Sequence, residues 1–143
     1  MKIAVIRAEE GRVVESYEFE GSLADVVKDI ARQAMDEWDP SESDFFVMRD
    51  AREITIGAEV DDDTLRELEE EGLARREDGQ VKVLLQYYTI SFDTELVEDE
   101  NYVDRKVYVI APLVVPTLKD ELEAYAASLT SGSGQPPPGI KEL

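Results

Sequence analysis

Residues Val81 to Phe92 form the longest strand-like run in the chain, and apolar residues occupy both of its faces. A strand of this kind needs cover on both sides, so it belongs in the middle of a sheet. Asp78-Gly79, directly before this run, is a strong signal for a two-residue hairpin turn. The chain is therefore expected to fold around a sheet with this strand at its centre.

Further strands are predicted on both sides of the long run. The alternating segments Lys2–Ala8 and Arg12–Phe19 predict an opening hairpin, and Asp44–Asp50 with Arg52–Ile56 predict a second one. Tyr102–Ala111 predicts a last strand, paired with the long strand across an acidic loop.

Three helices complete the predicted order. Ser22 caps a helix whose apolar residues recur at helical spacing up to Trp38. Asp61 caps a short helix closed by Gly72, and an amphipathic helix follows Thr117. The order ββαββαβββα lacks regular βαβ alternation, so we predict an α+β fold. In it, two amphipathic helices and one short helix pack on one face of a largely antiparallel sheet.

The chain has 143 residues, a length that fits one domain. Residues 131–139 consist of Ser, Gly, Gln and Pro, a composition typical of linkers. We therefore predict a single α+β domain at residues 1–130, followed by a flexible C-terminal arm at residues 131–143.

The chain contains no Cys and no His. Disulfides, thiolate zinc sites, cysteine nucleophiles and Ser-His-Asp triads are thereby excluded, and no catalytic or cofactor-binding residue can be assigned. No segment approaches the roughly 20 apolar residues of a membrane helix. We expect a cytoplasmic protein without membrane contact.

The composition is strongly acidic: 34 Asp and Glu against 15 Lys and Arg give a net charge of −19. Phosphate backbones are bound mainly by Lys and Arg, so direct nucleic-acid binding is not expected, whereas a basic protein partner is. Residues 68–83 resemble the helix-to-wing junction of winged-helix regulators. Their upstream segment, however, is predicted as strands and not as the recognition helix that such domains need.

One acidic segment could hold a hard cation such as Mg²⁺ or Ca²⁺, which prefers clustered oxygen ligands. Its spacing does not match a calcium loop, so a solvated turn is the simpler interpretation. The candidate ligands are Asp93, Glu95, Glu98, Asp99, Glu100 and Asp104. They define the alternative function, a divalent-cation-dependent hydrolase or phosphoryl-transfer enzyme.

Three segments carry a resemblance to a known family: Lys2–Val14, Ser43–Asp50 and Tyr102–Pro112. In these the chain resembles a small archaeal family known only as a domain of unknown function. The resemblance implies an archaeal cytoplasmic protein with no assigned activity.

Because catalytic side chains are scarce, we expect a non-enzymatic protein-interaction or self-assembling module that forms a homodimer or a higher oligomer. Tyr87 and Tyr88 point to opposite faces of the long strand, so one of them is a candidate for an interface. Ile140 and Leu143 offer apolar anchors in the arm, which would dock on a neighbouring subunit or on its own domain. An exposed sheet edge is a second route to self-association. A nucleic-acid mimic, whose carboxylates imitate phosphates, is a third hypothesis.

Overall fold

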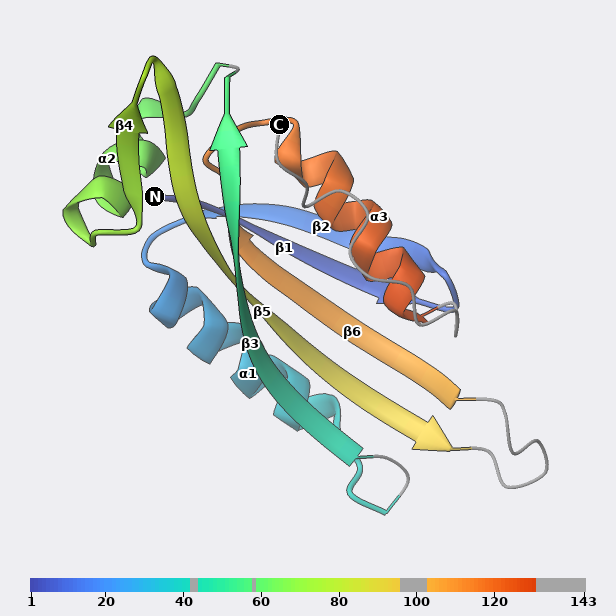
Figure 1. Cartoon of the computed structure of the whole chain (residues 1–143). Coiled ribbons are helices and arrows are strands. Elements are labelled where there is room, and N and C mark those ends of the chain that lie inside the picture. The colour runs from blue at the N-terminus through green and yellow to red at the C-terminus, as the bar shows by residue number, and fades with distance from the viewer. Residues whose placement is uncertain (42–43, 58, 96–102, 131–143) are drawn as a thin grey trace.

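The computed structural model describes residues 1–41, 44–57, 59–95 and 103–130, and Figure 1 shows the ribbon. Within these residues six strands and three helices follow the order ββαβαβββα, which confirms the predicted α+β class. The strands are β1 (Lys2–Glu9), β2 (Arg12–Glu20), β3 (Asp44–Ile56), β4 (Ala74–Glu77), β5 (Gln80–Glu95) and β6 (Val103–Pro112). The helices are α1 (Leu23–Glu37), α2 (Asp62–Glu70) and α3 (Leu118–Thr130).

The strands form one antiparallel sheet in the order β2-β1-β6-β5-β3, with β4 paired to the beginning of β5. β5 is the long strand expected near the centre. One of its edges pairs with β4 and then with β6, as predicted, and its other edge pairs with β3. β3 is therefore the outermost strand on that side of the sheet, as Figure 1 shows.

Residues 44–56 form one continuous strand, so the prediction of a second hairpin is wrong. Asp44 to Ile56 pair with β5 without a register shift. A type I′ hairpin turn needs positive φ at both central residues; Asp50 tolerates it, but the segment contains no Gly or Asn to follow it. With Ala51 at the expected turn, the backbone stays extended and the strand alternation continues.

Two tight turns have positive φ at both central residues. Glu10 and Gly11, with φ of 53° and 79°, join β1 to β2, and Asp78 and Gly79, with 52° and 77°, join β4 to β5. This is the type I′ pattern, whose twist matches that of the flanking strands. The predicted hairpin turn at Asp78-Gly79 is confirmed.

Side chains cap α1 and α2 as the sequence predicts. The Ser22 hydroxyl accepts the backbone N–H of Asp25 at 3.2 Å at the start of α1. The Asp61 carboxylate accepts the backbone N–H of Thr64 at 3.1 Å at the start of α2, and Gly72 follows that helix with φ of 75°. Each cap supplies an acceptor to an N–H group that has no partner within its helix.

Thr64 also ties α2 to the first strand. Its fully buried hydroxyl donates to Oδ2 of Asp61 at 2.6 Å and accepts the backbone N–H of Lys2 at 2.9 Å. The α-amino group of Met1, next to Lys2, forms an ion pair with Glu67 of the same helix. α2 is thus held against the beginning of β1 by polar contacts, which suits its narrow apolar face.

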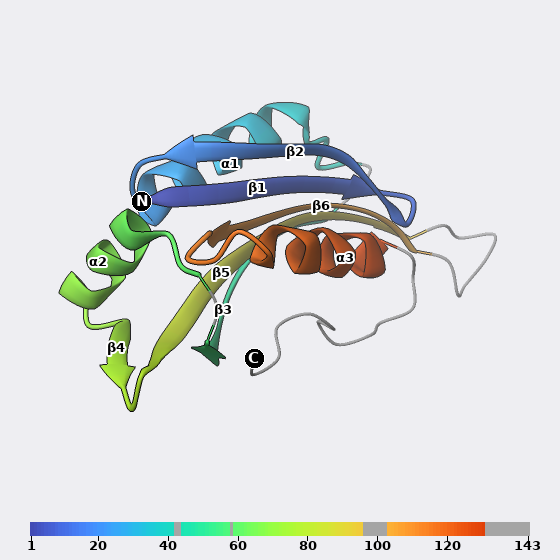
Figure 2. The ribbon, with the colours of Figure 1, turned by 90° about the horizontal axis from the view of Figure 1, so that it is seen from above.

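Helices cover both faces of the sheet, so the prediction that they share one face is wrong. Figure 2 shows α1 on one side of the strands and α3 on the other. The central strands explain this arrangement, because Ile3–Ile6 of β1 and Val107–Ala111 of β6 are buried at successive positions. Successive side chains of a strand point to opposite faces, so such strands need cover on both sides.

The core therefore has two layers, one between α1 and the sheet and one between α3 and the sheet. Val26, Ile30 and Ala34 bury the inner side of α1. Leu118, Leu122 and Ala126 bury that of α3. None of the helices in the described ranges combines the length and apolar character that a membrane crossing requires.

Candidate interaction site on the outer strand

The two outermost strands, β2 and β3, each have one edge that pairs with no strand in the described part of the chain. Such an edge presents backbone N–H and C=O groups that can pair with another chain. β2 also exposes Val14, Tyr17 and Phe19, but three glutamates are interspersed among them, and charges of one sign along an edge discourage pairing. The side chains of β2 thus protect its free edge from pairing with another chain better than those of β3 do.

β3 exposes an apolar segment at its free edge. Phe46, Val47 and Met48 are consecutive and are 44%, 50% and 64% exposed. Phe45, directly before them, is half-buried against Trp38 and Phe92 on the α1 side of the sheet. Exposed apolar residues that lie together mark interaction sites more often than isolated ones do. We call Phe45–Met48 the apolar segment of β3.

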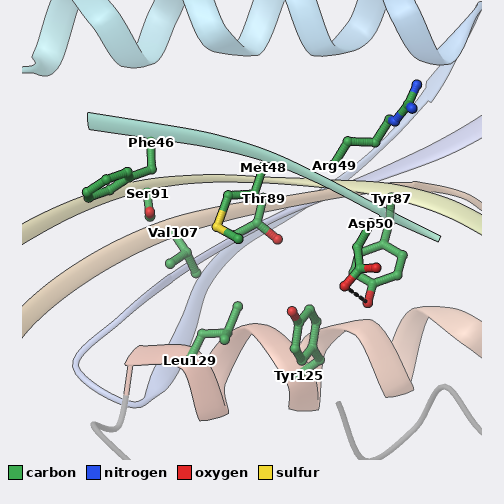
Figure 3. Close-up of a pocket in the computed structure, with 10 residues that line it drawn as sticks. All are labelled: Phe46, Met48, Arg49, Asp50, Tyr87, Thr89, Ser91, Val107, Tyr125 and Leu129. Atoms are coloured by element: carbon green, nitrogen blue, oxygen red, sulfur yellow. Dashed lines mark hydrogen bonds between the residues drawn. The ribbon is translucent and has the colours of Figure 1, made fainter. Parts of the chain in front are cut away.

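A groove lies between this strand and α3. α3 covers β1, β6 and β2 but leaves the α3-facing side of β5 and β3 partly open, and the resulting cavity has a volume of 360 Å³. Figure 3 shows side chains from the strands and from α3 pointing toward one another across it, while Arg49 points to the other side of the sheet. The side chains that line the groove include Phe46, Met48, Asp50, Tyr87, Thr89, Ser91, Val107, Tyr125 and Leu129.

Polar groups gather at one end of the groove. The Tyr87 hydroxyl donates to Oδ2 of Asp50 at 3.1 Å, and the Asp50 carboxylate also accepts the backbone N–H of Ala51 at 2.8 Å. The Tyr87 ring packs edge-on against Tyr125, with centroids 5.9 Å apart. Burial, with contributions from Tyr125 and Asp50, raises the pKa of Tyr87 well above its ordinary value. The groove therefore combines an apolar floor with one exposed carboxylate and buried phenols.

A second polar cluster lies on the α1 side of the sheet. The Arg7 guanidinium lies over the Tyr108 ring, 5.3 Å from its centroid, and donates to Glu37 at 3.2 Å. The Tyr108 hydroxyl donates to the same carboxylate at 3.3 Å. Burial is the main cause that raises the pKa of Tyr108 to about 12. All of its charged members are paired, which is typical of a structural cluster.

An alkaline titration is expected to reveal these two tyrosines. Their pKa values are raised in the folded state, so the neutral phenols stabilise the fold fully below pH ~10, the ordinary tyrosine pKa. That contribution is lost as the pH rises through about 12, the pKa of Tyr108. Ultraviolet absorbance should show that Tyr87 and Tyr108 ionise above the ordinary tyrosine range, together with unfolding. Tyr108→Phe should remove part of the late step; all tyrosines ionising near pH 10 in a folded protein would contradict the assignment.

The predicted metal ligands are only partly within the described residues. Glu98, Asp99 and Glu100 lie outside them, whereas Asp93 and Glu95 are at the end of β5 and Asp104 is near the start of β6. In the strand register Asp93 is opposite Arg105, and Asp104 is opposite Thr94. Elsewhere, the described residues contain no group of three or more side chains that could hold a metal ion. The cation site remains a prediction from the sequence.

The predicted interface residues fall in different places. Tyr87 is buried in the groove, at 3% exposure, and Tyr88 is half-buried on the opposite face of β5. Ile140 and Leu143 lie outside the described residues. Sequence reasoning missed the apolar segment of β3 as a site because it divided that strand into a hairpin. The four consecutive apolar residues were the signal that could have revealed it.

Comparison with known proteins identifies the family but no activity. The chain matches over residues 2–131 a family described as an uncharacterized protein conserved in archaea (DUF2286). No curated protein and no solved structure matches the chain. The matched range contains all the strands and helices described above, including β3 and the groove. The protein therefore belongs to the archaeal family DUF2286.

Proposed function

We propose that the protein is a self-associating interaction module in which β3 pairs with β3 of a second copy. The observation that carries the proposal is the free edge of β3 with its exposed apolar segment. Pairing two such edges would satisfy the open backbone groups of both strands and remove apolar surface from water. Cyclic dimers with a two-fold axis are the commonest assemblies of identical chains.

The charges of β3 support one register for this pairing. If two copies of β3 pair in antiparallel fashion across a two-fold axis perpendicular to the sheet, residues directly opposite each other point to the same face of the sheet. An axis through Met48 places Asp44 of each copy opposite Arg52 of the other, because both residues are four positions from Met48. Asp44 and Arg52 are both exposed in the single chain. The register thus joins opposite charges at both ends of the apolar segment.

The local charge of β3 favours a second copy at this edge despite the net charge of −19. β3 carries Asp44, Asp50 and Glu53 against Arg49 and Arg52, so its charge is close to balanced. In β2, Arg12 is the only cation and faces three glutamates. Two copies therefore repel each other less at β3 than at the opposite edge of the sheet.

Sedimentation velocity tests the proposal on the full chain over a range of concentrations. We expect a species of twice the chain mass of 16.1 kDa, and Val47→Lys should convert it to monomer. In the proposed register residue 47 lies opposite Arg49 of the partner, so the lysine adds like-charge repulsion. Val14→Lys on β2, where Val14 is 38% exposed, is the matched control and should leave the dimer intact.

A charge exchange tests the register itself. Asp44→Arg should weaken the dimer, because it places two arginines opposite each other, and adding Arg52→Asp should restore it. A full chain that stays monomeric at every concentration would reject the proposed function. A dimer that survives Val47→Lys would reject the β3 interface, and failure of the second substitution to rescue the first would reject the register.

A further inference from the structure

The groove beside β3 is open and apolar, and the C-terminal arm begins next to it. Leu129 lines one end of the groove and Thr130 is the last residue of α3. Met48, over the middle of the groove, is 64% exposed. The residues beyond Thr130 include Pro136, Pro137 and Pro138, followed by Gly139, Ile140 and Lys141. A proline-rich segment therefore follows in the sequence soon after Leu129, a residue that lines this groove.

We infer that residues 136–141 of the arm bind in the groove of their own chain. Proline segments in the polyproline conformation are bound by aromatic-lined grooves, since they lose little conformational entropy on binding. Phe46, Tyr87 and Tyr125 supply the aromatic rings here, and Val107 and Leu129 supply aliphatic surface. The occupant is the chain's own arm because the tether keeps its effective concentration high.

The lengths of arm and groove agree. Residues 131–135 can extend to about 16 Å, which is enough to reverse direction after α3. A polyproline segment from Pro136 to Lys141 spans about 15 Å at ~3.1 Å per residue. Along β3 the groove runs from Phe46 to Asp50, about 13 Å at ~3.3 Å per residue. An arm that enters beside Leu129 thus brings Lys141 to the far end of the groove.

Charge is complementary at that far end. Asp50 is exposed, and its two carboxylate oxygens each accept one hydrogen bond, from Tyr87 and from Ala51. A carboxylate oxygen has a second lone pair, so the carboxylate can also accept the Lys141 ammonium group. Ile140, directly before Lys141, would lie over the apolar floor near Met48. Binding of the arm therefore fills the apolar part of the groove and pairs its exposed carboxylate.

Paramagnetic relaxation in the full chain tests this inference. The protein has no Cys, so Gly139→Cys provides a single position for a nitroxide label. In the Val47→Lys background, where the proposed edge pairing is blocked, the label should broaden the amide signals of Thr89 and Asp50. It should leave that of Met35, on the opposite side of the sheet, unchanged. In this background, binding of the arm is measured without pairing of β3 strands. The proposed self-association and the proposed binding of the arm can therefore fail independently.

Matched lysine substitutions on neighbouring residues of β3 complete the experiment. Met48→Lys, on the groove face, should abolish the broadening at Thr89 and Asp50, whereas Val47→Lys, on the other face, retains it. Lys141→Glu should weaken the broadening at Asp50, and Lys141→Arg should preserve it. No broadening at Asp50 in the Val47→Lys background would overturn the inference. So would broadening seen only between labelled and isotope-enriched molecules in a mixture, since that places the arm on a second copy.

Discussion

Replacing Leu122 by Ala should lower the free energy of unfolding by about 3 kcal/mol, within the range of about 2–5 kcal/mol for buried Leu→Ala changes. Leu122 is fully buried on the inner side of α3, which packs on β1 and β6. Truncation removes apolar contacts and leaves a cavity that close-packed strands on the other side cannot fill. Urea unfolding followed by circular dichroism measures the change.

Leu84→Ala is the matched control for this experiment. Leu84 is on β5 and is 41% exposed, so the same truncation removes less buried surface and leaves no enclosed cavity. We expect a loss of about 1 kcal/mol or less. Equal losses for Leu122→Ala and Leu84→Ala would show that α3 does not close the core in the way described.

Replacing Thr64 by Val should lower the free energy of unfolding by about 2 kcal/mol, although the two side chains have nearly the same shape. The change leaves the backbone N–H of Lys2 buried without its acceptor and removes the hydroxyl that donates to Asp61. Chemical unfolding compares this variant with Thr64→Ser, which keeps the hydroxyl and should retain most of the stability that Val loses. A smaller loss for Val than for Ser would contradict the role of the hydroxyl.

The Thr64→Val variant should also respond differently to acid. The Thr64 hydroxyl is the main reason that the pKa of Asp61 lies below its usual value in the folded protein. A lowered folded-state pKa gives stability that is fully present above the unfolded pKa of about 4 and is lost as the pH falls further. The stability difference between the wild type and Thr64→Val should therefore narrow between about pH 5 and pH 3. A difference that widens in acid would contradict this linkage.

Capping and turn residues in the sequence correctly predicted helix starts and a hairpin turn, because these features depend only on neighbouring residues. Ser22, Asp61 and the Asp78-Gly79 turn act where they were expected, because capping and turn geometry are decided within a few residues. The sequence pattern predicts a break at Ala51 instead of the continuous β3, because the pairing of β3 with β5 involves residues far along the chain. The lack of Gly or Asn after Asp50 argues against a hairpin at this point.

The candidate site was less accessible to sequence reasoning. The opposite orientations of Tyr87 and Tyr88 follow from strand alternation, but the contact of Tyr87 with Asp50 depends on the register between β5 and β3. The groove in turn depends on which strands α3 covers, and a helix's own periodicity does not contain that information. The burial of β1 and β6 at successive positions was the signal for helices on both faces. In the sequence this signal consists of the consecutive apolar residues of Ile3–Ile6 and Val107–Ala111.

The pairing of β1 with β6 has a consequence for how the chain is synthesised. β1 leaves the ribosome before the other strands of this sheet, whereas its partner β6 begins only at Val103 and the covering helix α3 ends at Thr130. Contacts between segments so distant in sequence form slowly, because the intervening chain must first be closed into a loop. Until then the apolar residues Ile3, Val5 and Ile6 have only β2 as a neighbouring strand. Until β6 and α3 have been synthesised, the nascent chain thus leaves the apolar residues of β1 exposed, a state in which strands are vulnerable to aggregation.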